Sequence, residues 1–127
     1  MDENEISKII IGAALDVHRA MGPGLLESVY QQCLAHEMKL QGMAFKQEVL
    51  LKAEYKGLLF DSSYIMDYVV AEKVVVKLKV VESLLSVHEA QLLFYLRLSG
   101  YRLGLLINFN VVMLKTGIKR IVNNLHE

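Results

Sequence analysis

The segment that decides the fold is Tyr64-Ile65-Met66-Asp67-Tyr68-Val69-Val70, followed by Ala71-Glu72-Lys73 and then by Val74-Val75-Val76-Lys77-Leu78-Lys79-Val80-Val81. Two apolar runs rich in β-branched residues flank a three-residue turn, which predicts two central strands folded side by side as a hairpin. Because side chains alternate in direction along a strand, Lys77 and Lys79 lie on one face. The hairpin is therefore expected to bring one carboxylate, that of Asp67, beside two ammonium groups.

Length and composition indicate a single domain spanning residues 1–127. The chain has 127 residues, 54% of them hydrophobic, which is enough to bury roughly two-thirds of the surface that the unfolded chain exposes. Its 14 basic and 14 acidic residues cancel, so the overall positive field of a constitutive nucleic-acid binder is absent. Any contact with DNA must come from a local patch.

The sequence favours a soluble protein of the reducing cytoplasm. Its lone cysteine, Cys33, cannot form an internal disulfide. The first residues, Met1-Asp2-Glu3-Asn4-Glu5, are acidic where a signal peptide is basic. The longest apolar stretch, residues 101–114, is interrupted by Arg102 and two asparagines and falls short of the about 20 residues that span a bilayer. We expect neither export nor a membrane partner.

The amino-terminal part of the chain follows a helical period. Apolar residues recur at helical spacing over residues 6–21, and Gly22-Pro23-Gly24 halts this first helix. A second helix starts at once and carries Glu27 in its first turn, where the helix dipole favours a carboxylate. It is expected to end near Leu40, with Gly42 as a left-handed cap.

The period changes to two at Phe45. Charged residues alternate with less polar ones from there, so we expect a strand with one wet face. Lys56-Gly57 turns the chain into a second strand from Leu58 to Val70, and the strand that carries Lys77 is the third.

The carboxyl-terminal part adds a helix and two further strands. Ser86 and Glu89 have the spacing of a capping box, which predicts a helix that ends at Ser99. A strand over residues 102–109 should lie parallel to the third strand, through a right-handed crossover. Residues 118–122 fit a short edge strand. The chain therefore predicts a mixed α/β fold with a four- to five-stranded sheet flanked by helices.

Several sequence blocks carry a family resemblance. They are Gly24-Leu25-Leu26-Glu27-Ser28-Val29-Tyr30, Ile11-Gly12-Ala13-Ala14, Val17-His18, Gly22-Pro23-Gly24, His88-Glu89-Ala90-Gln91 and Leu105-Leu106-Ile107-Asn108-Phe109-Asn110. In this order, from about residue 6 to residue 123, the chain resembles the GxxExxY family of the PD-(D/E)xK nuclease-like superfamily. The resemblance implies a restriction-endonuclease-like core and a descent from enzymes that cleave DNA with Mg²⁺.

The resemblance also implies roles for individual residues. Asp67 and Glu27 would be catalytic and would bind the metal, Lys79 would be the catalytic lysine, and Gln91 and Tyr95 would contact the nucleotide backbone. Lys77 stands where the family pattern has an acidic residue, and its ammonium group would meet a phosphate.

Lys77 weakens the expectation of catalysis. A divalent cation about 4 Å from an ammonium group is repelled by roughly 8 kcal/mol at an effective dielectric constant near 20. Millimolar Mg²⁺ binding contributes only about 4 kcal/mol. We therefore expect a degenerate Mg²⁺-dependent nuclease whose catalysis is weakened or lost, although a long lysine stem can carry its charge away from a metal.

Other interpretations stay open at this point. Each of these residues has an alternative, structural role. Asp67 would neutralise Lys77 across the hairpin, Glu27 would complement the helix dipole, and Tyr95 would fill the core. The alternative function is a non-catalytic binding or assembly module on the same fold. Zero net charge and the nearly all-apolar helix before Ser99 support it, and they are consistent with a homo-oligomer.

Overall fold

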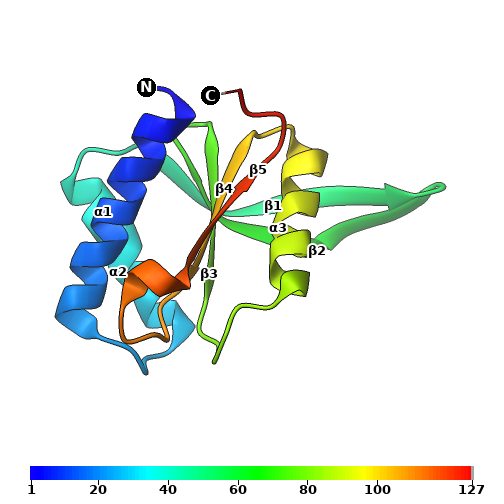
Figure 1. Cartoon of the computed structure of the whole chain (residues 1–127). Helices are drawn as coiled ribbons and strands as arrows, with labels where there is room; N and C mark the ends of the chain where they lie inside the picture. Colours follow the sequence, from blue (N-terminus) through cyan, green and yellow to red (C-terminus); the bar gives the residue numbers. More distant parts are fainter. Residues whose placement is uncertain (127) are drawn as a thin grey trace.

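The computed structural model describes residues 1–126, except for the side chains of residues 61–63. Over these described residues, three α-helices, a short 3-10 helix and five strands follow one another (Figure 1). Their bounds are α1 Glu3–Met21, α2 Glu27–Leu40, β1 Phe45–Tyr55, β2 Leu58–Val70, β3 Val74–Lys79, α3 Ser86–Ser99, β4 Leu103–Asn108, η1 Leu114–Gly117 and β5 Ile118–Val122. No helix of this described part is long and apolar enough to cross a membrane.

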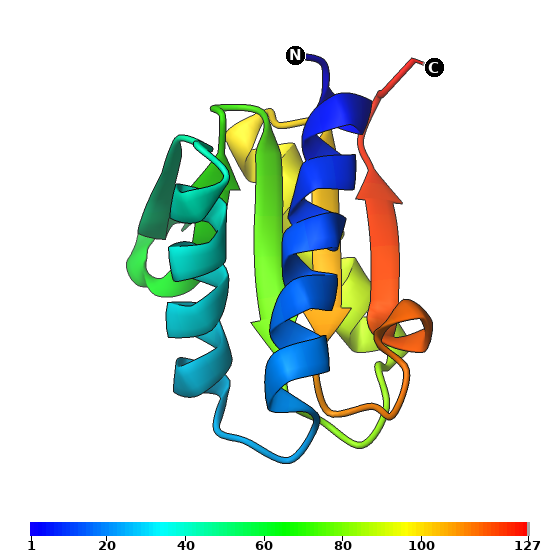
Figure 2. The ribbon, with the colours of Figure 1, turned by 90° about the vertical axis from the view of Figure 1, so that its left-hand side faces the viewer.

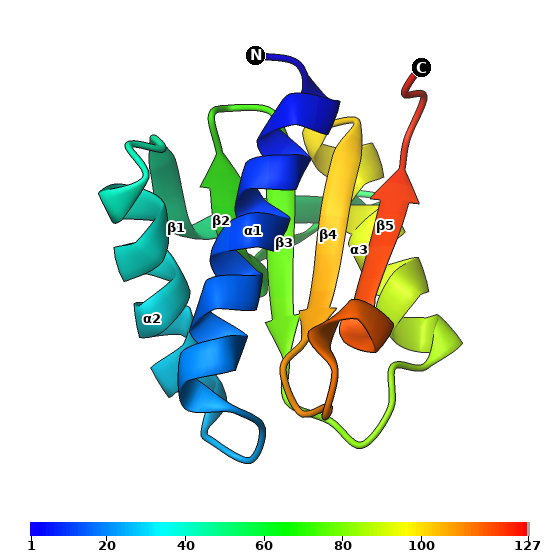
Figure 3. The same ribbon diagram turned by 60° about the vertical axis from the view of Figure 1, so that its left-hand side comes forward.

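The five strands form one mixed sheet in the order β1-β2-β3-β4-β5 (Figure 3). Neighbouring strands are antiparallel except β3 and β4, which run parallel from Val74 beside Leu103 to Lys79 beside Asn108. The chain passes between these two strands through α3. The predicted hairpins, the parallel crossover and the mixed α/β fold are confirmed.

Helices cover both faces of the sheet. Helices α1 and α2 lie side by side on one face, and α3 lies on the other (Figure 2). Val74, Val76 and Leu78 of β3 belong to the core beneath α1 and α2, while Val75 belongs to the smaller core beneath α3. A strand that is buried on both faces has no wet side, which explains the uninterrupted apolar run.

The first hairpin does not keep one wet face, contrary to the sequence prediction. Phe45 packs with the core under α1 and α2, but Val49 and Leu51 of the same strand pack with the core under α3. Between them Glu48 has a φ of 52°, a left-handed conformation that interrupts the regular alternation of side chains. The hairpin therefore crosses from one face to the other, and its far end projects beyond α3 (Figure 1).

The start of α3 also differs from the prediction. Ser86 already lies inside the helix, and Leu85 occupies the capping position. The acceptor at this end is His88, whose Nδ1 receives the backbone N–H of Leu85 at 3.0 Å. The imidazole thus takes the role that the capping box assigned to Glu89. The end of the helix agrees with the prediction, since Gly100 has a left-handed φ of 82°.

Tyr30 fixes the loop between α1 and α2. Its hydroxyl donates to the carbonyl oxygen of Gly22 at 2.5 Å and accepts from the N–H of Leu25 at 3.2 Å. Its ring stacks on Phe109, with centroids 4.5 Å apart. The final tyrosine of the Gly24–Tyr30 block therefore holds the turn that precedes Glu27.

Tyr30→Phe should lower the free energy of unfolding by about 1 to 2 kcal/mol, because the ring stays but two backbone groups lose their partner. Urea unfolding followed by circular dichroism measures this loss. Tyr55→Phe is the matched control, since Tyr55 is exposed on the projecting hairpin, and it should change little. Equal stabilities for the two variants would contradict the role given to the Tyr30 hydroxyl.

Candidate functional site

Asp67 lies where strands β2 and β3 separate. Among the described residues, their pairing runs from Val70 beside Val74 to Tyr68 beside Val76. Beyond this pairing, the side chain of Asp67 takes the place of a backbone partner on β2. Its Oδ2 accepts the backbone N–H of Leu78 at 2.7 Å. Asp67 is buried, and a buried amide without such an acceptor would lower stability.

Lys77 fills the gap that the separating strands leave. Its ammonium group lies 3.4 Å from Oδ1 of Asp67 and 3.4 Å from the carbonyl oxygen of Ile65. Only 18% of the Lys77 side chain is exposed, against 7% for that of Asp67. Both carboxylate oxygens of Asp67 are thus engaged, one by an ammonium group and one by an amide.

Lys79 lies further along β3 and shares the direction of Lys77 by strand alternation. Its backbone is tied to the next strand, because its carbonyl oxygen accepts the N–H of Phe109 at 3.1 Å. The side chain is partly buried. Among the described residues, the ion pair of Asp67 is with Lys77 and not with Lys79.

Glu27 belongs to the other layer of the molecule. It is the exposed first residue of α2, which packs on the face opposite α3. Across the described part of the chain, its carboxylate forms no ion pair, and no group of three histidine, cysteine, aspartate or glutamate side chains is placed to hold a metal ion. The structure does not join Glu27 and Asp67 into a larger acidic cluster.

Helix α3 contributes Tyr95 to the surroundings of Asp67. Burial, then the charge of Asp67, and then Tyr64 raise the pKa of the Tyr95 phenol, so it stays protonated at neutral pH. Gln91, one turn earlier on the same helix, is partly buried. The aromatic neighbour of Tyr95 is Tyr64, at 5.8 Å between ring centroids, a residue that sequence reasoning missed although it stands three places before Asp67.

Tyr68 follows Asp67 on β2, and its side chain belongs to the core under α1 and α2. Burial raises the pKa of its phenol, and the charge of Asp67 and then Cys33 add to the shift. Its hydroxyl donates to the carbonyl oxygen of Gln31 in α2. The charge of Asp67 therefore acts on two tyrosines, Tyr95 on α3 and Tyr68 on β2 itself.

The residues around Asp67 do not fit a magnesium ion. Mg²⁺ prefers several oxygen ligands in an octahedral arrangement. Here one carboxylate is present, an amide occupies its first oxygen, and a positive charge lies 3.4 Å from its second oxygen. A metal ion would have to displace the Lys77 ammonium group before it could bind.

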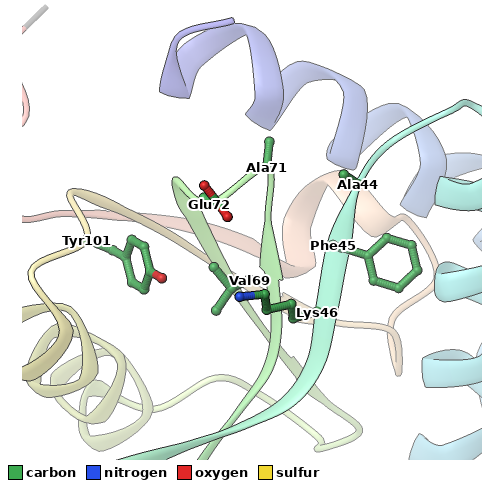
Figure 4. Close-up of a pocket in the computed structure, with 7 residues that line it drawn as sticks. All are labelled: Ala44, Phe45, Lys46, Val69, Ala71, Glu72 and Tyr101. Atoms are coloured by element: carbon green, nitrogen blue, oxygen red, sulfur yellow. The ribbon is translucent and has the colours of Figure 1, made fainter.

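The candidate residues also lie apart from the hollow near the turn between β2 and β3. That hollow is formed by Ala44, Phe45, Lys46, Val69, Ala71, Glu72 and Tyr101 (Figure 4). The predicted site residues are not among these lining residues, although Val69 follows Asp67 by two positions on β2. The side chains of Asp67 and Lys77 are largely buried against one another, so the arrangement around Asp67 is a packed ion pair.

The fold and the placement of these residues define a class. A mixed sheet between helical layers, with Asp67 on one strand of a hairpin and two lysines on the next, is a restriction-endonuclease-like α/β fold. A family model described as the PD-(D/E)XK nuclease superfamily matches residues 4–121. The chain belongs to this superfamily.

Comparison with solved structures supports the fold. A structure titled "Crystal structure of SSO0001" is similar, with a TM-score of 0.58, 20% sequence identity and coverage of 79% of this chain. The matched region is 52% of that chain, so this protein spans about half the length of that relative. No curated protein matches the chain significantly.

Asp67→Ala should lower the free energy of unfolding by about 3 kcal/mol, because it leaves the Leu78 amide and the Lys77 ammonium group without their partner. Asp67→Asn should lose less, since an amide oxygen can still accept the N–H of Leu78. Urea unfolding compares the two variants with Glu82→Ala, an exposed control expected within about 0.5 kcal/mol of wild type. Equal losses for Asn and Ala would contradict the structural role of the Leu78 hydrogen bond.

Proposed function

We propose that this protein is a nuclease-fold member of the GxxExxY type, derived from Mg²⁺-dependent DNA phosphodiester hydrolases, whose catalysis is weakened or lost. The observation that carries the proposal is the ion pair of Lys77 with Asp67. The hairpin keeps one acidic residue of the superfamily pattern, Asp67. The ammonium group of Lys77 lies beside its carboxylate, in the place that a metal ion would take.

Electrostatics supports this proposal. Glu27, Asp67, Lys77 and Lys79 sum to zero formal charge, whereas three acids and one lysine sum to minus two. A neutral group attracts a divalent cation poorly. Of the predicted metal ligands, Asp67 is engaged by Lys77 and Leu78, while Glu27 is exposed at the start of α2.

The finer family assignment rests on the Gly24–Tyr30 block. In the structure its tyrosine holds the α1–α2 loop by two hydrogen bonds, to Gly22 and Leu25. Its glycine, Gly24, has a left-handed φ of 92°, so both residues have a structural reason. A cytoplasmic location agrees with Cys33, which has no cysteine partner in the chain.

Lys77→Glu should create an Mg²⁺ site that wild type lacks. Without metal, the two carboxylates at residues 67 and 77, where β2 and β3 separate, should repel one another and lower the melting temperature. Bound Mg²⁺ should raise the melting temperature again. Calorimetric titration and thermal melting with and without Mg²⁺ measure binding, and plasmid nicking measures cleavage. Wild type should respond in none of these assays, or at least about a hundredfold more weakly.

Lys115→Glu is the matched control, because it makes the same charge change at an exposed position on η1. It should behave as wild type does in all three assays. A folded Lys77→Glu protein that neither binds Mg²⁺ nor cleaves would remove the functional content of the proposed ancestry. Strong cleavage by wild type would overturn the proposed loss of catalysis.

A second candidate function is non-catalytic binding of a DNA backbone. The observation that favours it is the side chain of Lys79, which is partly exposed beside Lys77 and is not the partner of Asp67. Two neighbouring ammonium groups with one carboxylate tolerate a phosphate better than an acidic cluster does. The zero net charge of the chain predicts that such binding is weak and limited to this patch.

Lys79→Ala should weaken DNA binding similarly for all sequences and should reduce the slope of log affinity against log salt by about 0.7 to 0.9, as one phosphate contact is lost. Fluorescence anisotropy with labelled DNA over a salt series measures both quantities. Lys39→Ala, which removes an exposed lysine from the end of α2, is the control. An unchanged slope for Lys79→Ala would exclude this contact.

A further inference from the structure

Strand β5 forms one edge of the sheet. Its five residues, Ile118–Val122, pair with β4 in a regular register, and the described part of the chain places no strand on its other side. Figure 2 shows this edge beside α1, and the guanidinium group of Arg120 donates to the side-chain oxygen of Asn4 on that helix. β5 contains no proline. Such an edge can bind an extended segment of another chain through its backbone groups.

An apolar cleft lies between α1 and this edge. It has a volume of about 430 Å³ and is lined by Ile11, Leu15, Lys115 and Ile118. Ile11 and Leu15 are four residues apart, so they lie on one face of the helix. Together with Ile118 they pack against the main core but remain partly exposed. The cleft therefore offers apolar surface directly beside a free strand edge.

The surroundings of the cleft are positively charged. Lys115 lines it, Lys8 lies on the same face of α1 as the two lining residues of that helix, and Lys119 lies on β5. All three are exposed, and within the described part of the chain none of them takes part in an ion pair. Asp16 on α1 is already paired with Arg19. These ammonium groups favour a ligand that carries carboxylates.

The alternation of side chains along β5 defines the pattern of that ligand. Ile118 packs with the core under α1, and Ile121 packs with the core under α3. Val122, 45% exposed, therefore lies on the α1 side with Ile118, while Lys119 lies on the α3 side. A segment added beside β5 places every second side chain next to the cleft and the others next to Lys119. Apolar residues alternating with acidic residues match both sides.

Other occupants fit this surface less well. The β5 strand of a second copy carries Lys119 and Arg120 and no acidic residue, so it cannot supply the complementary charge. The phosphate backbone of a nucleic acid would meet the lysines but would leave the apolar cleft between Ile11 and Ile118 unfilled. An extended acidic segment of a protein uses the charges, the cleft and the strand edge together.

We propose that the β5 edge binds an extended segment of an acidic partner protein, in which apolar and acidic residues alternate. The backbone of the segment adds a strand beside Ile118–Val122, and its apolar side chains enter the cleft. Its carboxylates meet Lys119 on one side of the sheet and Lys8 and Lys115 around the cleft. Asp67 and Lys77 lie on other strands, so this inference does not depend on the proposed function.

Designed peptides test the pattern. Fluorescein-labelled Glu-Val-Glu-Val-Glu-Val-Glu should bind saturably in fluorescence anisotropy. Three changed peptides should each bind at least about tenfold more weakly: one with the same residues in two blocks, one with serine in place of valine, and one with lysine in place of glutamate. Hydrogen exchange with the first peptide bound should slow at Ile118–Val122 and not at the other sheet edge, β1.

Charge reversal on the protein tests the location. Lys8→Glu/Lys119→Glu should weaken binding of the alternating peptide at least about tenfold, because two attractive contacts become repulsive. Lys39→Glu/Lys52→Glu makes the same charge change at exposed positions on α2 and β1 and should bind as wild type does. Circular dichroism verifies that both double variants are folded.

Several results would overturn the proposal. They are no saturable binding of the alternating peptide, equal binding of the blocked or serine peptide, and equal binding by the two double variants. Slower exchange in β1 instead of β5 would place the contact elsewhere. Displacement of the bound peptide by an equimolar single-stranded DNA oligonucleotide would assign this surface to a phosphate backbone and would also overturn the proposal.

Discussion

The carboxylate of Asp67 has to satisfy two demands at one point of the sheet. Strands β2 and β3 separate beside it, so the amide of Leu78 loses its ladder partner and takes Oδ2 instead. The remaining oxygen carries a negative charge in a largely buried position, where an unpaired charge is strongly unfavourable. The ammonium group of Lys77 supplies the compensating charge. Loss of either donor should therefore destabilise the sheet at this point.

Under the proposed function, this compensation explains how the fold can persist with reduced chemistry. In an acidic site the compensating cation is a metal ion, which can also activate water and polarise a phosphate oxygen. A lysine ammonium group neutralises the same carboxylate but does not coordinate several oxygens at once. It is also attached to the chain and cannot be exchanged. In the proposed function, Lys77 in place of a metal ion preserves the electrostatic balance around Asp67 but supplies no Lewis acid.

Local patterns predicted most of this arrangement, and long-range packing decided the rest. The apolar runs around Asp67 and Lys77 and the short turn between them were sufficient to predict the pairing of these two side chains. The change of face at Glu48 was not predictable, because a glutamate carries no sequence signal for positive φ. The Leu78 contact depends on where β2 separates from β3, and the approach of Tyr64 to Tyr95 depends on how α3 packs on β2, so neither was visible in the sequence.

The point beside Asp67 at which β2 and β3 separate also connects the two parts of the hairpin. The inner part of β2, Tyr68–Val70, is anchored in the sheet, while the outer part of the hairpin projects beyond α3 (Figure 1). The contact of Asp67 with Leu78 lies at the junction, so it restrains the direction in which the outer part leaves the core. A phosphate attracted by Lys77 would have to compete with Asp67 for the same ammonium group. A ligand bound at Lys77 and the direction of the outer hairpin would therefore depend on the same carboxylate.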